Sequence, residues 1–201
     1  MSLRTARNVR VIGEAEGRTI GWWGTVIGLI ALAHLVAAVN VAAVYLRSVS
    51  GTWPPGATEP PEVWMGLLAV GLAVLAAVAT GVAAAIHGRG GGPLGMPMLF
   101  VAALLALGAA GVRGAGTIFS DHPVTEHAYW SMRWFMGGLD VTLLGATGIA
   151  LLTAAVHAVR GWLRPGAHAE LASITLWTAI VAVFVGVNWL VLTGVTLWWG
   201  G

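Results

Sequence analysis

The sequence has 201 residues, of which 58% are hydrophobic and only 9% charged, and its mean hydropathy is +0.84. A soluble domain carries about 25% charged residues, so this chain has too few charges to cover a surface that faces water. Its ten basic residues are all arginine and form no basic stripe, which argues against nucleic acid as a partner. Cysteine is absent, which excludes disulfides and cysteine-ligated zinc or iron–sulfur centres. The composition therefore predicts an integral membrane protein.

The first 20 residues form a polar tail with no compact apolar core. Its charged residues are Arg4, Arg7, Arg10, Glu14, Glu16 and Arg18. A cleavable signal peptide needs an apolar core of its own, so we expect residues 1–20 to remain as a cytoplasmic tail. Residues 21–201 then form a single transmembrane domain.

Five apolar runs follow the tail, and each is long enough to cross a bilayer. We expect the spans at Gly21–Leu46, Val63–Ile86, Met96–Val112, Tyr129–Val159 and Leu171–Trp199. The segments between them carry helix-breaking proline and glycine, as in the proline-rich loop 47–61, the turn 88–93 and the turn 161–167. The predicted fold is all-α, a polytopic bundle of five transmembrane helices.

The distribution of arginine predicts the orientation of this bundle. The tail holds four arginines, the turn after the second span one and the turn after the fourth span two, which makes seven on one side. The other side holds Arg47, Arg113 and Arg133. Because short cytoplasmic segments are enriched in arginine, we expect the N-terminus inside, the C-terminus outside, and a location in the inner (plasma) membrane of the cell.

Tryptophan is concentrated near the ends of the predicted spans. Aromatic rings at these depths anchor helices at the two membrane interfaces. Trp53, in the loop after the first span, belongs to this set.

Few strongly polar side chains fall inside the spans, and such residues are candidates for function. They are His34, Asn40, Asp140 and Asn188. His34 could ligate haem, but a bis-histidine site needs a second histidine at the same depth, and the other histidines lie near span ends or in loops. We therefore expect His34 to make an interhelical hydrogen bond or a contact with a partner subunit.

Asp140 is the one carboxylate well inside a span. Arg133 precedes it by seven residues, two helical turns, and so lies on the same helix face. We expect an ion pair between them or a contact with lipid headgroups near the outer side. A proton-relay role is the alternative, although no second buried carboxylate is present to take the proton onward.

Glycines recur along the fourth span, at Gly137-Gly138, Gly145 and Gly148. Glycine lets another helix or a lipid chain approach closely, and such packing drives association in membranes. We expect this face to contribute to assembly with a partner.

One loop and the order of the spans resemble subunit III of the haem–copper oxidases, in its short five-helix form. The closest local match is Gly51-Thr52-Trp53-Pro54-Pro55 with Glu59-Pro60-Pro61, which is similar to the family's Trp-Pro-Pro loop after the first retained helix. Ala128-Tyr129 at the start of the fourth span and the aromatic-rich last span also agree, and the resemblance covers 29–199. The chain departs from the family pattern at His34, where the family usually has a glutamate, at 108–113 and around Asp140. Of the family signature in the last helix, it keeps only Val187-Asn188-Trp189.

The resemblance implies a non-catalytic subunit of a respiratory terminal oxidase, which supports assembly, lipid binding and proton uptake of a larger catalytic subunit. The chain itself would bind no cofactor or metal, and the haem and copper would belong to that partner. Lipid or other subunits would be contacted through His34, Trp53, Arg133, Asp140 and Asn188. The alternatives are a haem-b membrane anchor of a respiratory dehydrogenase and a small membrane transporter.

Overall fold

The computed structural model describes residues 20–53, 63–89, 94–118, 123–161 and 168–197, and these form five long helices. The helices are α1 (Ile20–Val49), α2 (Val63–Gly88), α3 (Gly95–Ile118), α4 (Ala128–Val159) and α5 (His168–Leu197). Each is long and apolar enough to cross a membrane. The all-α fold and the five apolar helices are confirmed, and they indicate a multi-pass membrane protein.

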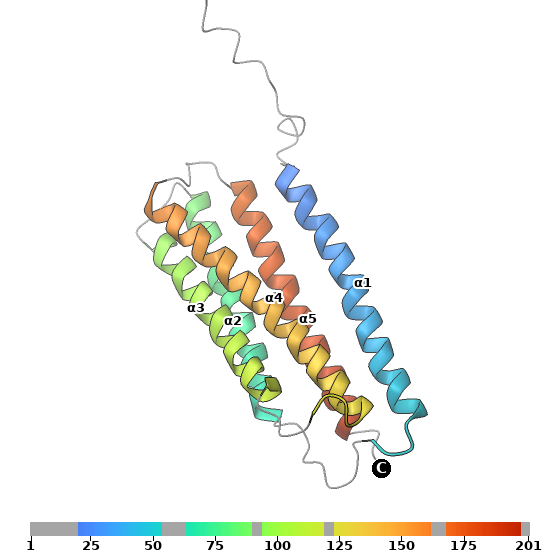
Figure 1. The fold of residues 1–201 in the computed structure, drawn as a ribbon. Coiled ribbons are helices and arrows are strands. Elements are labelled where there is room, and N and C mark those ends of the chain that lie inside the picture. Colours follow the sequence, from blue (N-terminus) through green and yellow to red (C-terminus); the bar gives the residue numbers. More distant parts are fainter. Residues whose placement is uncertain (1–19, 54–62, 90–93, 119–122, 162–167, 198–201) are drawn as a thin grey trace, which may run out of the picture.

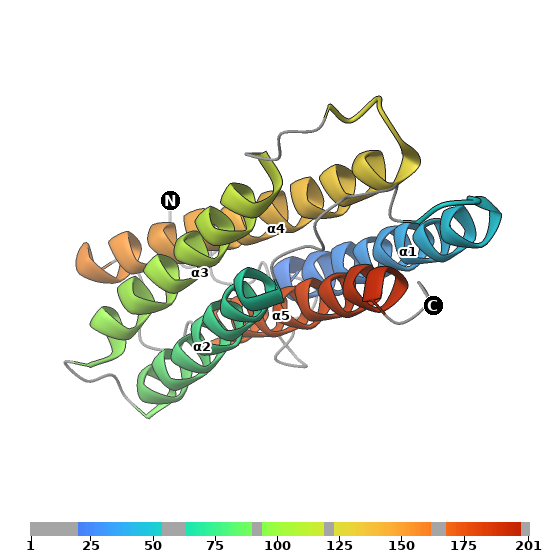
Figure 2. The same ribbon diagram turned by 90° about the horizontal axis from the view of Figure 1, so that it is seen from below.

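Successive helices run in opposite directions, so α1, α3 and α5 finish at the end of the bundle where α2 and α4 begin (Figure 1). We call this the Trp53 end, after the residue that follows α1 there. Helices α2, α3, α4 and α5 make a four-helix group, in which α3 packs between α2 and α4. Helix α1 lies outside this group against α5, and touches α4 less extensively (Figure 2).

The predicted spans agree with these helices to within three residues at most ends, and the largest difference is in α3. The prediction ended the third span at Val112 because Arg113 resembled a boundary with water. In the structure α3 continues to Ile118, and Arg113 lies inside it. The helix can continue because the Arg113 side chain is paired with Asp140 of α4.

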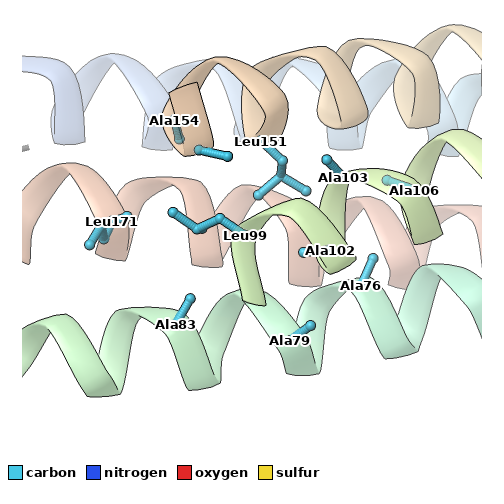
Figure 3. Packing of buried hydrophobic residues seen from close by; sticks show 11 residues of the cluster. Ala76, Ala79, Ala83, Leu99, Ala102, Ala103, Ala106, Leu151, Ala154 and Leu171 are labelled. Carbon is cyan, nitrogen blue, oxygen red and sulfur yellow. The ribbon is translucent and has the colours of Figure 1, made fainter. Parts of the chain in front are cut away.

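Alanines line the contacts that α3 makes with α2 and α4 (Figure 3). The cluster consists of Ala76, Ala79, Ala83, Leu99, Ala102, Ala103, Ala106, Leu151, Ala154, Ala155 and Leu171. Such small side chains allow the helix backbones to approach closely, and dispersion contacts then stabilise the packing in a lipid solvent. This layer occupies the half of the bundle opposite the Trp53 end.

Candidate functional site

A chain of hydrogen-bonded polar side chains crosses the bundle from α3 to α1. Arg113 Nε of α3 lies 2.8 Å from Asp140 Oδ2 of α4. Asn188 of α5 donates from Nδ2 to Asp140 Oδ1 at 2.7 Å. Asn40 of α1 donates from Nδ2 to Asn188 Oδ1, also at 2.7 Å. Four of the five helices are therefore connected through one set of side chains.

This polar chain is buried inside the protein. Asp140 and Asn188 are fully buried, Asn40 is 8% exposed, and the Arg113 side chain is 12% exposed. Two polar atoms remain without a hydrogen-bond partner among the described residues, Nη2 of Arg113 and Oδ1 of Asn40. They mark the two ends of the chain. Asp140 and Asn188 thus contact this chain's own helices.

The arrangement is suited to holding helices rather than to moving protons. Both carboxylate oxygens of Asp140 have a partner, one a guanidinium and the other an amide. A guanidinium stays protonated in proteins, and a side-chain amide does not titrate, so neither neighbour can take a proton from Asp140 and pass it onward. Removing one partner of a buried ion pair destabilises a protein strongly, because the remaining charge is left uncompensated. Helix arrangements that separate these partners are therefore unfavourable, and the chain of bonds specifies how the helices fit together.

The expected ion pair between Asp140 and Arg133 is not formed, and this part of the prediction was wrong. The two residues share a helix face but lie about 10 Å apart along α4 at 1.5 Å per residue, and Arg113 occupies the space beside Asp140. Arg133 instead donates from Nη2 to the carbonyl oxygen of Gly116, at 3.1 Å. Its guanidinium also lies 5.5 Å from the centre of the Trp130 ring. Arg133 therefore satisfies one of the last carbonyls of α3.

Trp53 belongs to an aromatic cluster at the Trp53 end. Its ring meets that of Tyr129 edge-on, with centroids 5.3 Å apart, and Tyr129 meets Trp130 in the same way at 5.0 Å. His127 caps α4 by accepting a hydrogen bond from the Tyr129 backbone N–H. Trp53 is only 5% exposed, so it packs the segment after α1 onto the start of α4.

His34 differs from the other predicted site residues because it points away from the bundle. It is exposed near the middle of α1, and its Nδ1 lies 2.7 Å from the carbonyl oxygen of Ile30. The interhelical hydrogen bond expected of His34 is not made to any helix that the structure describes. Its outward position agrees with the other expectation, a contact with a partner subunit, which stays a prediction.

The glycines of α4 divide into two sets. A Cβ at Gly137 would lie within 3 Å of Thr117, and one at Gly148 within 3 Å of Leu107, so both glycines let α3 approach. A Cβ at Gly138 or Gly145 would meet nothing within 4 Å. The expectation that Gly137 and Gly148 contribute to a surface for a partner was therefore wrong, because α3 of the same chain already covers both. For Gly138 and Gly145 it stays a prediction.

Sequence reasoning missed Arg113 as a member of the site and did not find the partner of Asn40. Arg113 was assigned to a loop. A buried Asp140 requires a cationic or hydrogen-bonding partner, and Arg113 was a candidate for that partner besides Arg133. Asn40 was noted as a polar residue without a partner. Its match with Asn188 could have been suspected, because each lies nine residues before the end of a helix that finishes at the same side.

Within the ranges that the structure describes, no three histidine, aspartate or glutamate side chains gather as they would to hold a metal ion. A comparison of the sequence with protein-family models finds no match. A comparison with curated proteins finds no significant match either.

Proposed function

We propose that this chain is a non-catalytic membrane subunit of a respiratory haem–copper oxidase, similar to subunit III, that supports assembly, lipid binding and proton uptake of a larger catalytic subunit. The observation that carries the non-catalytic part is the pairing of Asp140, whose two oxygens are held by Arg113 and Asn188. A carboxylate fixed in this way joins helices and leaves the redox chemistry to a partner.

The assignment to an oxidase rests on the Trp-Pro-Pro segment. Trp53, the described part of this segment, meets the ring of Tyr129 at the start of α4, and Tyr129 in turn meets Trp130. Two of the places at which the sequence resembles the family, Gly51-Thr52-Trp53 and Ala128-Tyr129, are therefore in contact with each other. Agreement of two distant segments at one location supports the proposal more than either segment does alone.

A cavity on the side of α1 supports the lipid-binding part. It has a volume of about 320 Å³ and lies between α1, α4 and α5. Small and apolar residues line it together with hydroxyl groups: Thr25, Ala146, Thr147, Ala150, Ser173, Ile174, Trp177 and Thr178. The hydroxyls of Thr25, Thr147 and Thr178 donate to carbonyl oxygens of their own helices, so the walls suit an acyl chain better than a polar ligand.

The proposed orientation has the N-terminus in the cytoplasm and the Trp53 end on the outer side of the plasma membrane, from the distribution of arginine. Reporter fusions test it. Fusions at Gly91 and Gly166 should report a cytoplasmic location, and fusions at Ala57 and Gly201 an external one. An external signal at Gly91 would overturn the orientation.

Purification in mild detergent tests the functional proposal. The full chain should be recovered in fixed stoichiometry with a larger haem-bearing subunit, detected by mass spectrometry and by the visible absorption of the haem. A matched purification of Trp53→Ala should lose part of the partner, because the aromatic cluster orders the Trp53 end. Recovery of a homo-oligomer without any haem protein would contradict the oxidase assignment.

A further inference from the structure

Helix α1 carries an ionisable side chain on an outward face of the bundle, far from both ends of the helix. His34 lies 14 residues after Ile20 and 15 before Val49, about 21 Å along the helix at 1.5 Å per residue. Among the described residues, His34 is the one ionisable side chain that is exposed and more than ten residues from both ends of its helix. In a bilayer this position is the hydrocarbon interior, where a polar side chain costs free energy unless it has a partner.

The residues around His34 follow the spacing of a helix–helix contact. They recur at intervals of three, four or seven along one side of α1 and are Trp23, Ile27, Ile30, His34, Val41 and Tyr45. All six are exposed. We call this set the α1 outer stripe. Val36 and Ala43, which face the bundle, lie about 200° around the helix from His34 and Val41. A repeat of three and four residues is that of left-handed helix pairs, which are common in membranes.

The hydrogen bond of His34 specifies the chemistry of its missing partner. A carbonyl oxygen only accepts, so Nδ1 must carry the hydrogen that bonds to Ile30. In the uncharged ring, the other nitrogen of this exposed side chain, Nε2, is then an acceptor. The group that completes His34 is therefore a hydrogen-bond donor.

A second copy of this chain does not supply that donor. Two copies that pair through this same stripe would be related by a twofold axis normal to the membrane, which places His34 opposite His34. Two Nε2 acceptors facing each other have no hydrogen between them. A helix from a different chain, with a hydroxyl, amide or other donor at the depth of His34, satisfies both the spacing and the bond.

We propose that the α1 outer stripe is the docking surface for a transmembrane helix of a partner subunit, which donates a hydrogen bond to Nε2 of His34. This inference rests on the proposed function in one respect, that the chain works within a larger complex. It goes further by assigning the face that is used and the chemistry of the partner residue.

Photo-crosslinking in the native membrane tests the proposal with the full chain. A photoreactive benzoylphenylalanine is placed at Val41 in the stripe and, as a matched control, at Leu104 of α3, because both side chains are 69% exposed. Val41 should form an adduct with a transmembrane segment of another subunit that has a hydrogen-bond donor about two helical turns from the attachment site, at the depth of His34. Leu104 should form adducts with lipid.

Two variants separate the hydrogen bond from the shape of the surface. His34→Gln retains an acceptor and should keep most of the Val41 adduct. His34→Phe retains a ring without an acceptor and should lower the adduct yield roughly threefold or more, the equilibrium change expected when one interhelical hydrogen bond is lost. Equal yields from the two variants would overturn the role of His34.

The remaining outcomes distinguish this inference from the proposed function. Val41 adducts with another copy of the chain, or with lipid alone, would refute the docking surface. If a haem-bearing subunit still purifies with the chain in that case, the proposed function survives. An adduct with a donor-bearing helix in a complex that contains no haem would support the docking surface and refute the oxidase assignment.

Discussion

Helix α3 meets α2 and α4 along alanine and glycine, whereas α1 packs on the bundle through fewer apolar residues, such as Val39 and Ala43, and through one polar bridge, with aromatic rings at the Trp53 end. On the α3 side the contact is made of small side chains such as Ala102 and Ala106, both about 1% exposed or less. On the α1 side the bridge is Asn40 with Asn188, and a cavity of about 320 Å³ lies further along.

The difference shows two ways of attaching a helix when lipid is the solvent. Lipid is as apolar as leucine, so burying apolar surface gives little net association. Close packing of small residues works because it increases the number of dispersion contacts along the whole helix. A polar bridge holds two helices together at one depth in the membrane, because separating them would leave an amide without a hydrogen-bond partner in hydrocarbon. We expect α3 to depend on shape, and α1 to depend on its polar bridge in addition to its apolar contacts.

The largest effect should come from removing the carboxylate at the centre of the polar chain. Asp140→Ala leaves the buried Arg113 guanidinium unpaired and should lower the free energy of unfolding by about 3–5 kcal/mol, measured by titration with a denaturing detergent. Replacing both Asp140 and Arg113 by leucine should recover most of that loss. Thr142→Ala is the control, because the Thr142 hydroxyl faces outward and bonds within its own helix. Wild-type stability of Asp140→Ala would show that the ion pair is dispensable.

The second prediction uses the two sets of glycines in α4. Gly148→Ala places a Cβ about 2.6 Å from Cγ of Leu107, so the Leu107 side chain or the α3 backbone must shift, and stability should fall by about 1–3 kcal/mol. Gly145→Ala is the matched control and should be neutral or slightly stabilising, since its Cβ meets nothing within 4 Å. Equal effects of the two changes on thermal unfolding would contradict the α3–α4 packing described here.

A smaller and more local effect is expected at the bridge to α1. Asn40→Ala removes the donor to Asn188 and should cost about 0.6 kcal/mol, the average for interhelical hydrogen bonds in membranes. Hydrogen exchange measured along the chain should rise in α1 while α3 keeps its protection. An equal rise in both helices would mean that α1 is not held separately.

The smallest effect concerns the wall of the cavity. Trp177 donates from Nε1 to the Thr147 hydroxyl at 2.9 Å, linking α5 to α4. Trp177→Phe removes that bond but keeps a large aromatic ring, so the cost should be at most about 0.6 kcal/mol. A double-mutant cycle with Thr147→Val measures the coupling energy. A coupling near zero would show that the indole and the hydroxyl contribute independently.

Much of the fold was predictable because membrane helices are specified by local composition. Five apolar runs bounded by proline and glycine predicted all five helices, since each helix satisfies its backbone hydrogen bonds by itself. The end of α3 was the exception. Arg113 resembled a boundary with water because a charge in hydrocarbon is unfavourable alone, and its partner Asp140 is 27 residues away in the sequence.

The sequence by itself determined which residues had to be explained, namely the polar groups His34, Asn40, Asp140 and Asn188 in an otherwise apolar chain. Only the tertiary structure decided how they are paired. Helix periodicity gives the face of each residue but not the rotation or depth of one helix against the next. Those quantities follow from packing at positions such as Gly137 and Gly148, and they placed Arg113 rather than Arg133 beside Asp140 and left His34 facing outward.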